Sequence, residues 1–424
     1  MHGREIACYW LCFLLLLPMF SSSQTSNTDE TRVPPYQLPE LQVTEAGIRI
    51  TTKEAWEAKR RPEVLSTIEK EVYGKVPPGE IDVETTEKIL DNHAFNGKAT
   101  LREITFVFKN KEKSSEATLL LILPNTKQPA PVFLGYNFQG NHTILPHEAI
   151  SLPKGWVLNG TQIGVMDNKA SQLSRGSKYS RWPILNILNH GYGVATMHYG
   201  DIDPDFDDGF KNGVHALFAE YGPFKPDEWG SIATWSWGLS RIVDYFETDD
   251  LIDHKKVAVI GHSRLGKATL WAGAIDTRFA MVVSNDSGCG GAALSKRRFG
   301  ETVSAINHQF PHWFCDNFNK YNDKESQMSF DQHFLLALIA PRPLYVASAK
   351  NDSWADPRGE FLAAKNASKV YALYGLTGLE NHDFPLENTP IREGSLGYHI
   401  RTGDHDLTIY DWEQFLYFAD HHLK

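Results

Sequence analysis

The segment Val257–Trp271 reads VAVIGHSRLGKATLW and combines a strand, a sharp turn and a helix. Its first residues, Val257–Ile260, form a β-branched apolar run that is typical of a buried strand. Gly261 interrupts this run, and small residues follow Gly266, as close packing of a helix on a sheet requires. A serine at such a turn exposes its hydroxyl, and the next backbone N–H is free to stabilise an oxyanion. We therefore predict a nucleophile elbow with Ser263 at its tip, although the second glycine lies one place later than in G-x-S-x-G.

Strand-like and helix-like segments alternate along the rest of the chain, and polar loops follow the strands. This alternation predicts an α/β fold with a mainly parallel central sheet between helices, and a site at the carboxyl ends of the strands. The predicted strands are Glu116–Leu123, Pro131–Phe138, Gly193–Tyr199, Met281–Ser284, Pro343–Ser348 and Val370–Tyr374. The predicted helices are Trp56–Val72, Thr234–Glu247 and Asp411–Leu423. The aspartate-rich segment 201–210 lacks the spacing of a calcium loop and is predicted to be a solvated loop.

Composition and the amino terminus restrict the functional class. The chain has 424 residues, 42% of them hydrophobic, and a net charge of −10. It is long enough for a large core, and its acidic balance argues against nucleic acid and polyanionic surfaces as partners. Arg4, the apolar run Leu11–Phe20 and the small residues after it predict a signal peptide over residues 1–23. The alternative, a membrane anchor, needs about 20 apolar residues. Residues 24–424 are then one catalytic domain with an N-terminal extension.

Loss of the signal peptide removes Cys8 and Cys12 and leaves Cys289 and Cys315 in the mature chain. Export permits a disulfide between them. Two buried free thiols are the alternative, because spacing alone does not fix the geometry of a bridge.

A serine nucleophile needs a base to take its proton and an acid to orient that base. In α/β-hydrolases these residues follow one another as serine, acid, histidine. His405 lies in a polar loop just before the last helix, where this fold class places its base, and His382 and His399 are the competing histidines. For the acid, the residues alone favour Asp352, which follows the strand PLYVAS, over Asp286, which follows an earlier strand.

Several motifs in this order resemble the glucuronoyl esterases, carbohydrate esterase family 15. The segment Gly261-His262-Ser263-Arg264-Leu265-Gly266-Lys267 resembles their G-x-S-R-x-G-K signature. Four further segments resemble that family as well: Asn285-Asp286-Ser287-Gly288, Arg297-Arg298-Phe299-Gly300-Glu301, Asn351-Asp352-Ser353-Trp354-Ala355-Asp356-Pro357 and Gly403-Asp404-His405. The resemblance covers most of the chain from about Pro124 onward and implies an α/β-hydrolase fold.

The resemblance also implies roles for individual residues. Ser263 would be the nucleophile, His405 the base, and Arg264 a side-chain donor to the oxyanion. Lys267, Glu301 and Trp354 would bind hydroxyl groups of a uronic acid.

The acid departs from the family pattern. Most members carry a glutamate where Asp286 stands, and some use an acid at the position of Asp352. The resemblance slightly favours Asp286, with Asp352 as a close second. The cysteine pair beside the nucleophile and the histidine of fungal members is replaced by His262 and Asp406, as in bacterial-type members.

The predicted function is therefore hydrolysis of glucuronate esters, such as those between 4-O-methyl-glucuronic acid on xylan and lignin alcohols. The resemblance implies no metal or organic cofactor and a secreted or periplasmic location, and we expect a monomer with no nucleic-acid or membrane partner. An acetyl-xylan or other carbohydrate esterase is one alternative, since the fold does not set the substrate. A carbohydrate-binding homologue without activity is another.

Overall fold

The computed structural model describes residues 26–219 and 225–424 and is built on a nine-stranded sheet in the order β1-β2-β3-β5-β4-β6-β7-β8-β9. Neighbouring strands from β5 through β4 to β9 run parallel. β1, β2 and β3 form an antiparallel meander, which joins the sheet where β3 pairs antiparallel with β5. The predicted mainly parallel α/β architecture is confirmed. The strands are β1 (Asp82–His93), β2 (Ala99–Asn110), β3 (Lys113–Pro124), β4 (Ala130–Asn137), β5 (Gly193–His198), β6 (Ile252–His262), β7 (Phe279–Asn285), β8 (Leu344–Ala349) and β9 (Leu396–Arg401).

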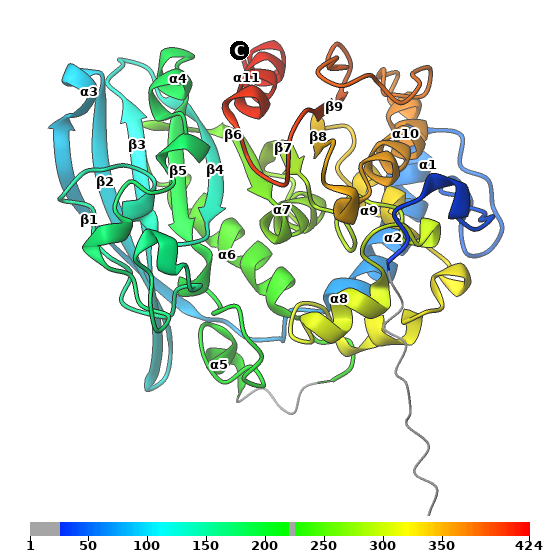
Figure 1. Ribbon diagram of the computed structural model, residues 1–424, viewed down its shortest axis with the longest axis horizontal. Coiled ribbons are helices and arrows are strands. Elements are labelled where there is room, and N and C mark those ends of the chain that lie inside the picture. Colours follow the sequence, from blue (N-terminus) through cyan, green and yellow to red (C-terminus); the bar gives the residue numbers. More distant parts are fainter. Residues whose placement is uncertain (1–25, 220–224) are drawn as a thin grey trace, which may run out of the picture.

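Helices cover both faces of the sheet, which gives three layers (Figure 1). One face packs against α4 and α11, and the other against α6, α7, α9 and α10. The helices are α1 (Lys53–Ala55), α2 (Arg61–Ile68), α3 (Ala94–Gly97), α4 (Ile184–Asn189), α5 (His215–Phe218), α6 (Ser231–Phe246), α7 (Arg264–Ile275), α8 (Val303–Gln309), α9 (Gln332–Ala337), α10 (Pro357–Leu373) and α11 (Ile409–Leu423).

The core is divided by the sheet into two apolar clusters. Alternate residues of β6 point to opposite faces: Val257 and Val259 join the cluster beneath α6 and α7, and Ala258 and Ile260 join the cluster beneath α11. This alternation follows from the two-residue period of a strand. Because both faces are covered, the central parts of the parallel strands β4 to β8 are mostly apolar, as the sequence indicated.

The predicted strand Val370–Tyr374 is wrong, because nearly all of it is the last part of α10. The buried residues Phe361, Ala364, Ala367 and Tyr371 recur at helical spacing on that helix. The strand beside β8 is instead β9, which contains a glycine, a histidine and an arginine.

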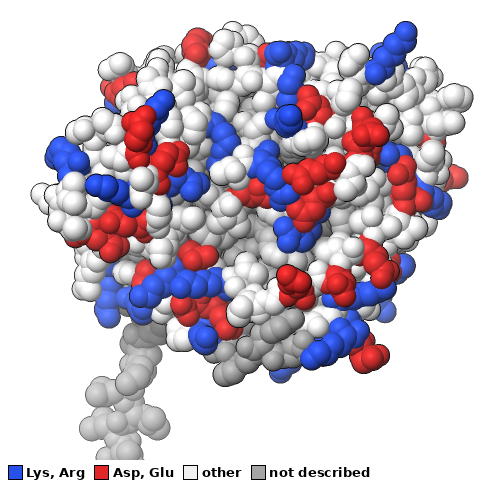
Figure 2. Space-filling model, turned by 180° about the vertical axis from the view of Figure 1, so that it is seen from behind, with Lys and Arg blue, Asp and Glu red and all other residues white. Residues whose placement is uncertain are grey.

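The predicted signal peptide, residues 1–23, lies outside the described residues. Within the described ranges, the helices are all too short or too polar to cross a membrane. Acidic and basic side chains are interspersed over the face in Figure 2, so the described residues of that face carry no broad area of one sign.

Candidate active site

Ser263 occupies a strained turn between β6 and α7, with φ 59° and ψ −130°. Non-glycine residues rarely adopt positive φ, and such strain persists only where the surrounding structure enforces it. A Cβ on Gly261 would lie 2.1 Å from the carbonyl oxygen of Leu265, and a Cβ on Gly266 would lie 3.0 Å from Cβ of Ser287. Both positions therefore require glycine, because a side chain there would clash with neighbouring parts of the chain. The second glycine comes one place later than in G-x-S-x-G because position 266 packs against Ser287, in the loop after β7.

His405 lies on the loop between β9 and α11, and its Nδ1 is 2.6 Å from Oδ2 of Asp352. Asp352 follows β8 and is nearly buried, whereas the imidazole is 42% exposed. A carboxylate that accepts from Nδ1–H fixes the tautomer in which Nε2 is free to take a proton. His399, by contrast, is buried within β9, where its Nε2 lies 2.9 Å from Asp411. Among the described residues that line the cavity of Ser263, His405 is the only histidine.

The slight preference for Asp286 as the orienting acid disagrees with this geometry. Both oxygens of Asp286 are buried without a hydrogen-bond partner among the described residues, and the nearest cation, Arg401 Nη2, is 3.6 Å away. Burial, and after it the charges of Glu360 and Asp352, raise the pKa of Asp286 well above its ordinary value. A neutral carboxylic acid is a poor partner for an imidazolium. The geometry favours Asp352, as the reading from the residues alone did.

Arg401 holds the histidine loop in place. Its Nη2 donates to the carbonyl oxygens of Asp404 and Asp406, at 2.9 and 2.6 Å, on either side of His405. Its Nε donates to the buried carboxylate of Asp411, which also accepts from the backbone N–H of Thr408 at the start of α11. His405 is thus fixed by a buried ion pair, although its own side chain is 42% exposed.

His262 packs against His405, with 4.5 Å between the two ring centroids. Its Nδ1 lies 2.6 Å from Oδ1 of Asn285. Burial, and after it the positive charge of His405, lower the pKa of His262 well below its ordinary value. The ring is therefore uncharged at neutral pH and does not repel an imidazolium that forms beside it.

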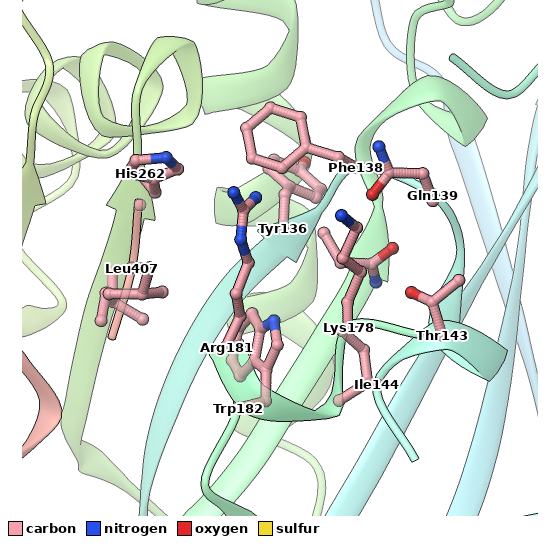
Figure 3. A pocket seen from close by; sticks show the side chains of 13 residues that line it. Tyr136, Phe138, Gln139, Thr143, Ile144, Lys178, Arg181, Trp182, His262 and Leu407 are labelled. Atoms are coloured by element: carbon pink, nitrogen blue, oxygen red, sulfur yellow. The ribbon is translucent and has the colours of Figure 1, made fainter. Parts of the chain in front are cut away.

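A small cavity lies on the β4 side of His262, and Figure 3 shows Arg181 between His262 and Lys178 there. Arg181 Nε pairs with Asp406 at 2.6 Å, which links this wall to the histidine loop. The cavity measures about 20 Å³, room for a water molecule but not for a sugar ring.

Arg264 is held by Asp205, whose Oδ2 forms an ion pair with the guanidinium. The other oxygen of Asp205 accepts from His312 at 2.9 Å and from Trp313 at 2.7 Å. Burial alone raises the pKa of Asp205, but the bond from His312, the charge of Arg264 and the bond from Trp313 lower it to about 2. Nε of Arg264 is buried without a partner among the described residues, which leaves it available to a ligand.

The interpretation of segment 201–210 as solvated is wrong for two of its aspartates. Asp203 and Asp205 are buried, and Asp203 accepts from His215 at 2.9 Å. Their alternation with apolar residues was the only sign of this in the sequence.

Ser263, Arg264, Asp286, Asp352 and His405 line one cavity of about 300 Å³, together with Lys267, Glu301 and Trp354. All eight predicted site residues are therefore brought together.

The three residues predicted to bind hydroxyl groups form one side of this cavity. Lys267 is buried and donates to the carbonyl oxygen of Ser287 at 2.6 Å. Burial raises the pKa of Glu301, and the charge of Lys267 opposes this rise. Trp354 is 44% exposed, so it is not a core residue. Its carbonyl oxygen accepts from the N–H of Glu301 at 2.9 Å, which joins the two motifs that carry these residues.

Cys289 and Cys315 are both free and buried. Burial raises the pKa of the Cys315 thiol to about 12 and that of Cys289 well above its ordinary value. Of the two readings left open, the structure has the free thiols.

Comparisons with known proteins identify the family of the chain. A family model described as "Glucuronyl esterase, fungi" matches residues 184–375. A protein named carbohydrate esterase MZ0003, from an unknown prokaryotic organism, is 49% identical over 408 residues, which are 96% of this chain and 94% of the relative.

Two solved structures cover nearly the whole chain. A promiscuous CE15 esterase from a marine bacterial metagenome is 50% identical with a TM-score of 0.88, over 94% of this chain and 100% of that one. A glucuronoyl esterase from Solibacter usitatus is 45% identical with a TM-score of 0.86, over 93% of this chain and 100% of that one. The α/β-hydrolase fold and the resemblance seen in the motifs are thereby confirmed: the chain belongs to carbohydrate esterase family 15, the glucuronoyl esterases.

Proposed function

We propose that this protein is a serine esterase that hydrolyses esters of glucuronic acid through an acyl-enzyme. The observation that carries the proposal is the single cavity that holds the elbow serine, the Asp352–His405 pair and the two cations Arg264 and Lys267. A nucleophile, an oriented base and fixed positive charge are the parts that acyl transfer requires. The natural substrate class is the ester between glucuronic acid on xylan and an alcohol of lignin.

In the first half of the reaction, Ser263 Oγ attacks the ester carbonyl carbon while Nε2 of His405 takes the hydroxyl proton. The oxyanion accepts hydrogen bonds from the backbone N–H of Arg264 and from its guanidinium, whose Nε has no other partner among the described residues. The imidazolium, stabilised by Asp352, then gives its proton to the leaving alcohol.

In the second half, water enters where the alcohol left, and His405 takes one of its protons. The resulting hydroxide attacks the acyl carbon, and the returning proton releases Ser263 and free glucuronic acid. Lys267 and Glu301 face the sugar during both halves and offer a donor and an acceptor to its hydroxyl groups.

The test compares methyl and benzyl esters of glucuronic acid with acetylated xylan as substrates. We expect turnover of the glucuronate esters, and a loss of about 10⁴-fold or more in kcat in Ser263→Ala. Turnover of acetyl esters alone would contradict the proposal and favour the acetyl-xylan esterase. Unchanged turnover in Ser263→Ala would exclude Ser263 as the nucleophile, and no turnover in the parent protein would favour the binding homologue.

Three further properties belong to this proposal. The signal-like segment over residues 1–23 supports secretion or export to a periplasm, where plant cell wall fragments are found. Residues 24–424 act as one catalytic domain, and the protein acts as a monomer. N-terminal sequencing of the exported protein and light scattering of the purified protein test these statements.

A further inference from the structure

A second cavity, of about 320 Å³, lies beside residues of β2, β3 and β5, strands whose place in the fold Figure 1 shows. Within the described residues, it shares no lining residue with the cavity of Ser263. Side chains on β2 and β3 form one wall, and the segment 151–156 with the loop after β5 forms the other. Its volume is within the range of pockets that bind small molecules.

A buried ring nitrogen without a partner lies in the wall of this cavity. His198 is 1% exposed, and its Nδ1 is 2.9 Å from Oδ1 of Asp201. Since a carboxylate only accepts, Nδ1 carries a proton in this pair. Among the described residues, Nε2 has no partner. Buried polar atoms are rarely left unpaired because this costs free energy, so the position fits a ligand group that both donates and accepts, such as a hydroxyl group.

The remaining polar groups also fit hydroxyl groups. Glu103 accepts from the N–H and the hydroxyl of Ser151, at 2.7 and 2.8 Å, and keeps further lone pairs. Glu116 pairs with Lys154 at 2.6 Å. Together with Asp201, the lining carries more carboxylates than ammonium groups. A uronate or phosphate would be repelled there, whereas a neutral polyol would not.

Trp156 supplies an apolar surface beside these groups. Its ring packs on Tyr199, with 6.3 Å between centroids, and on Phe206, with 5.7 Å. An aromatic face next to hydrogen-bonding groups suits a sugar ring, which presents C–H groups on its faces and hydroxyls on its edge.

The two cavities are neighbours through a shared wall. The hydroxyl of Tyr199, beneath Trp156, donates to Asp205 at 2.9 Å. Asp205 is the partner of Arg264 in the catalytic cavity, and it follows Pro204, which lines the second cavity.

We propose that this second cavity is a carbohydrate site for a neutral pyranose, filled by an unsubstituted backbone sugar of the polysaccharide whose glucuronate ester is cleaved. The inference deepens the proposed function and rests on it for the identity of the polysaccharide. The two sites divide the substrate: the esterified glucuronic acid goes to the cavity with Ser263, Arg264 and Lys267, and the unsubstituted sugar to the cavity with Glu103 and His198.

The experiment titrates the full-length Ser263→Ala protein with xylotetraose, which carries no uronate, and follows binding by calorimetry. We expect saturable binding that persists when glucuronic acid is present in excess. Trp156→Ala should weaken it at least tenfold. Tyr417→Ala, which removes an exposed aromatic side chain from α11, is the matched control and should leave the affinity unchanged.

A second variant keeps the test valid if the Trp156→Ala protein does not fold. Thr105 and Thr118 face each other across β2 and β3, and both line the cavity. The double change Thr105→Val/Thr118→Val keeps the shape and strand preference but removes two hydroxyl groups, and should weaken binding at least fivefold.

Absence of saturable binding at millimolar xylotetraose would overturn the inference, as would competition by glucuronic acid or equal affinity in all variants. Tighter binding of glucuronic acid than of xylotetraose at this site would overturn its charge preference. None of these results depends on turnover, so hydrolysis of glucuronate esters by the parent protein remains a separate test of the proposed function.

Discussion

The two candidate acids differ in a way that kinetics can separate. Asp352→Asn places an amide where the carboxylate accepts from Nδ1 of His405 over 2.6 Å. The amide can present its NH₂ group, which stabilises the tautomer that has the proton on Nε2 and cannot act as a base. In a serine triad the same change lowers kcat by about 10⁴-fold, or about 5.5 kcal/mol of transition-state stabilisation. We expect a loss of about 10³- to 10⁴-fold here.

Asp286→Asn should behave differently. Asp286 is buried, its pKa is raised, and its oxygens have no hydrogen-bond partner among the described residues. An asparagine has nearly the same shape, and the change removes no hydrogen bond to a described residue. We therefore expect kcat to fall less than about tenfold, because neither the charge next to His405 nor the packing around it changes much.

Steady-state kinetics on methyl glucuronate at neutral pH measure both effects, with thermal melting as the control for folding. The difference between the variants should lie in kcat, since neither acid is proposed to bind the sugar. A loss in Asp286→Asn as large as in Asp352→Asn would refute the reasoning, as would an Asp352→Asn protein within tenfold of the parent. In the first case the two carboxylates share the task, and in the second Asp352 is not the acid that orients His405.

Four further substitutions test the surroundings of the site and the stability of the fold. Asp205→Asn removes the charge that holds Arg264 and should lower kcat about 10²- to 10³-fold, the effect of losing one oxyanion donor. Gly261→Ala places a Cβ 2.1 Å from a backbone oxygen and should destabilise the fold by about 3 kcal/mol or more. Gly155→Ala, with no atom within 4 Å of the new Cβ, should change stability by less than about 0.5 kcal/mol. Burial raises the pKa of Glu360 to about 8, so the folded protein keeps a proton that the unfolded chain releases above its ordinary pKa near 4.5. The contribution of Glu360 to the free energy of unfolding is therefore fully present below its ordinary pKa and is lost as the pH rises toward 8. Because glutamine does not ionise, Glu360→Gln should gain stability relative to the parent over this range.

The measurements for these changes are independent of one another. For Asp205→Asn, a raised KM with an unchanged kcat would contradict the role in the oxyanion site. For the glycines, equal denaturation midpoints of the two alanine variants would contradict the packing argument. For Glu360→Gln, a melting temperature difference that does not grow between pH 5 and pH 8 would show that Glu360 is ionised in the folded protein.

Local pattern was sufficient to predict the elbow and most of the parallel strands. Their residues are buried on both faces, so their runs are apolar and short, and Ser263 follows one of them directly. β1 gave no such signal, because it is an edge strand whose residues are mostly exposed and polar. β9 was missed for another reason. Position 397 requires glycine, because a Cβ there would lie 2.4 Å from the ring of Tyr345. Arg401 is charged but forms an ion pair inside the protein. A glycine and an arginine within six residues do not form the apolar pattern that predicts a buried strand.

The motifs predicted the members of the site but not their pairings. Asp286 and Asp352 follow β7 and β8, which are neighbours in the sheet, so the order along the chain is satisfied by both. Which carboxylate reaches His405 depends on the direction of each side chain and on Arg401, which holds the histidine loop. Contacts made by residues far apart in sequence decide this.

The carboxylates of Asp286 and Asp352 lie close to each other and to His405. Asp286, Asp352 and His405 each place one polar atom within 4.8 Å of the others. Two ionised carboxylates at that distance repel by about 3 kcal/mol at an effective dielectric constant of about 20. Burial, and after it the charges of Glu360 and Asp352, raise the pKa of Asp286, whereas the carboxylate of Asp352 accepts from His405. A glutamate or aspartate at position 286 can then be exchanged without loss of the contact that orients His405, provided that the acid after β8 keeps its place.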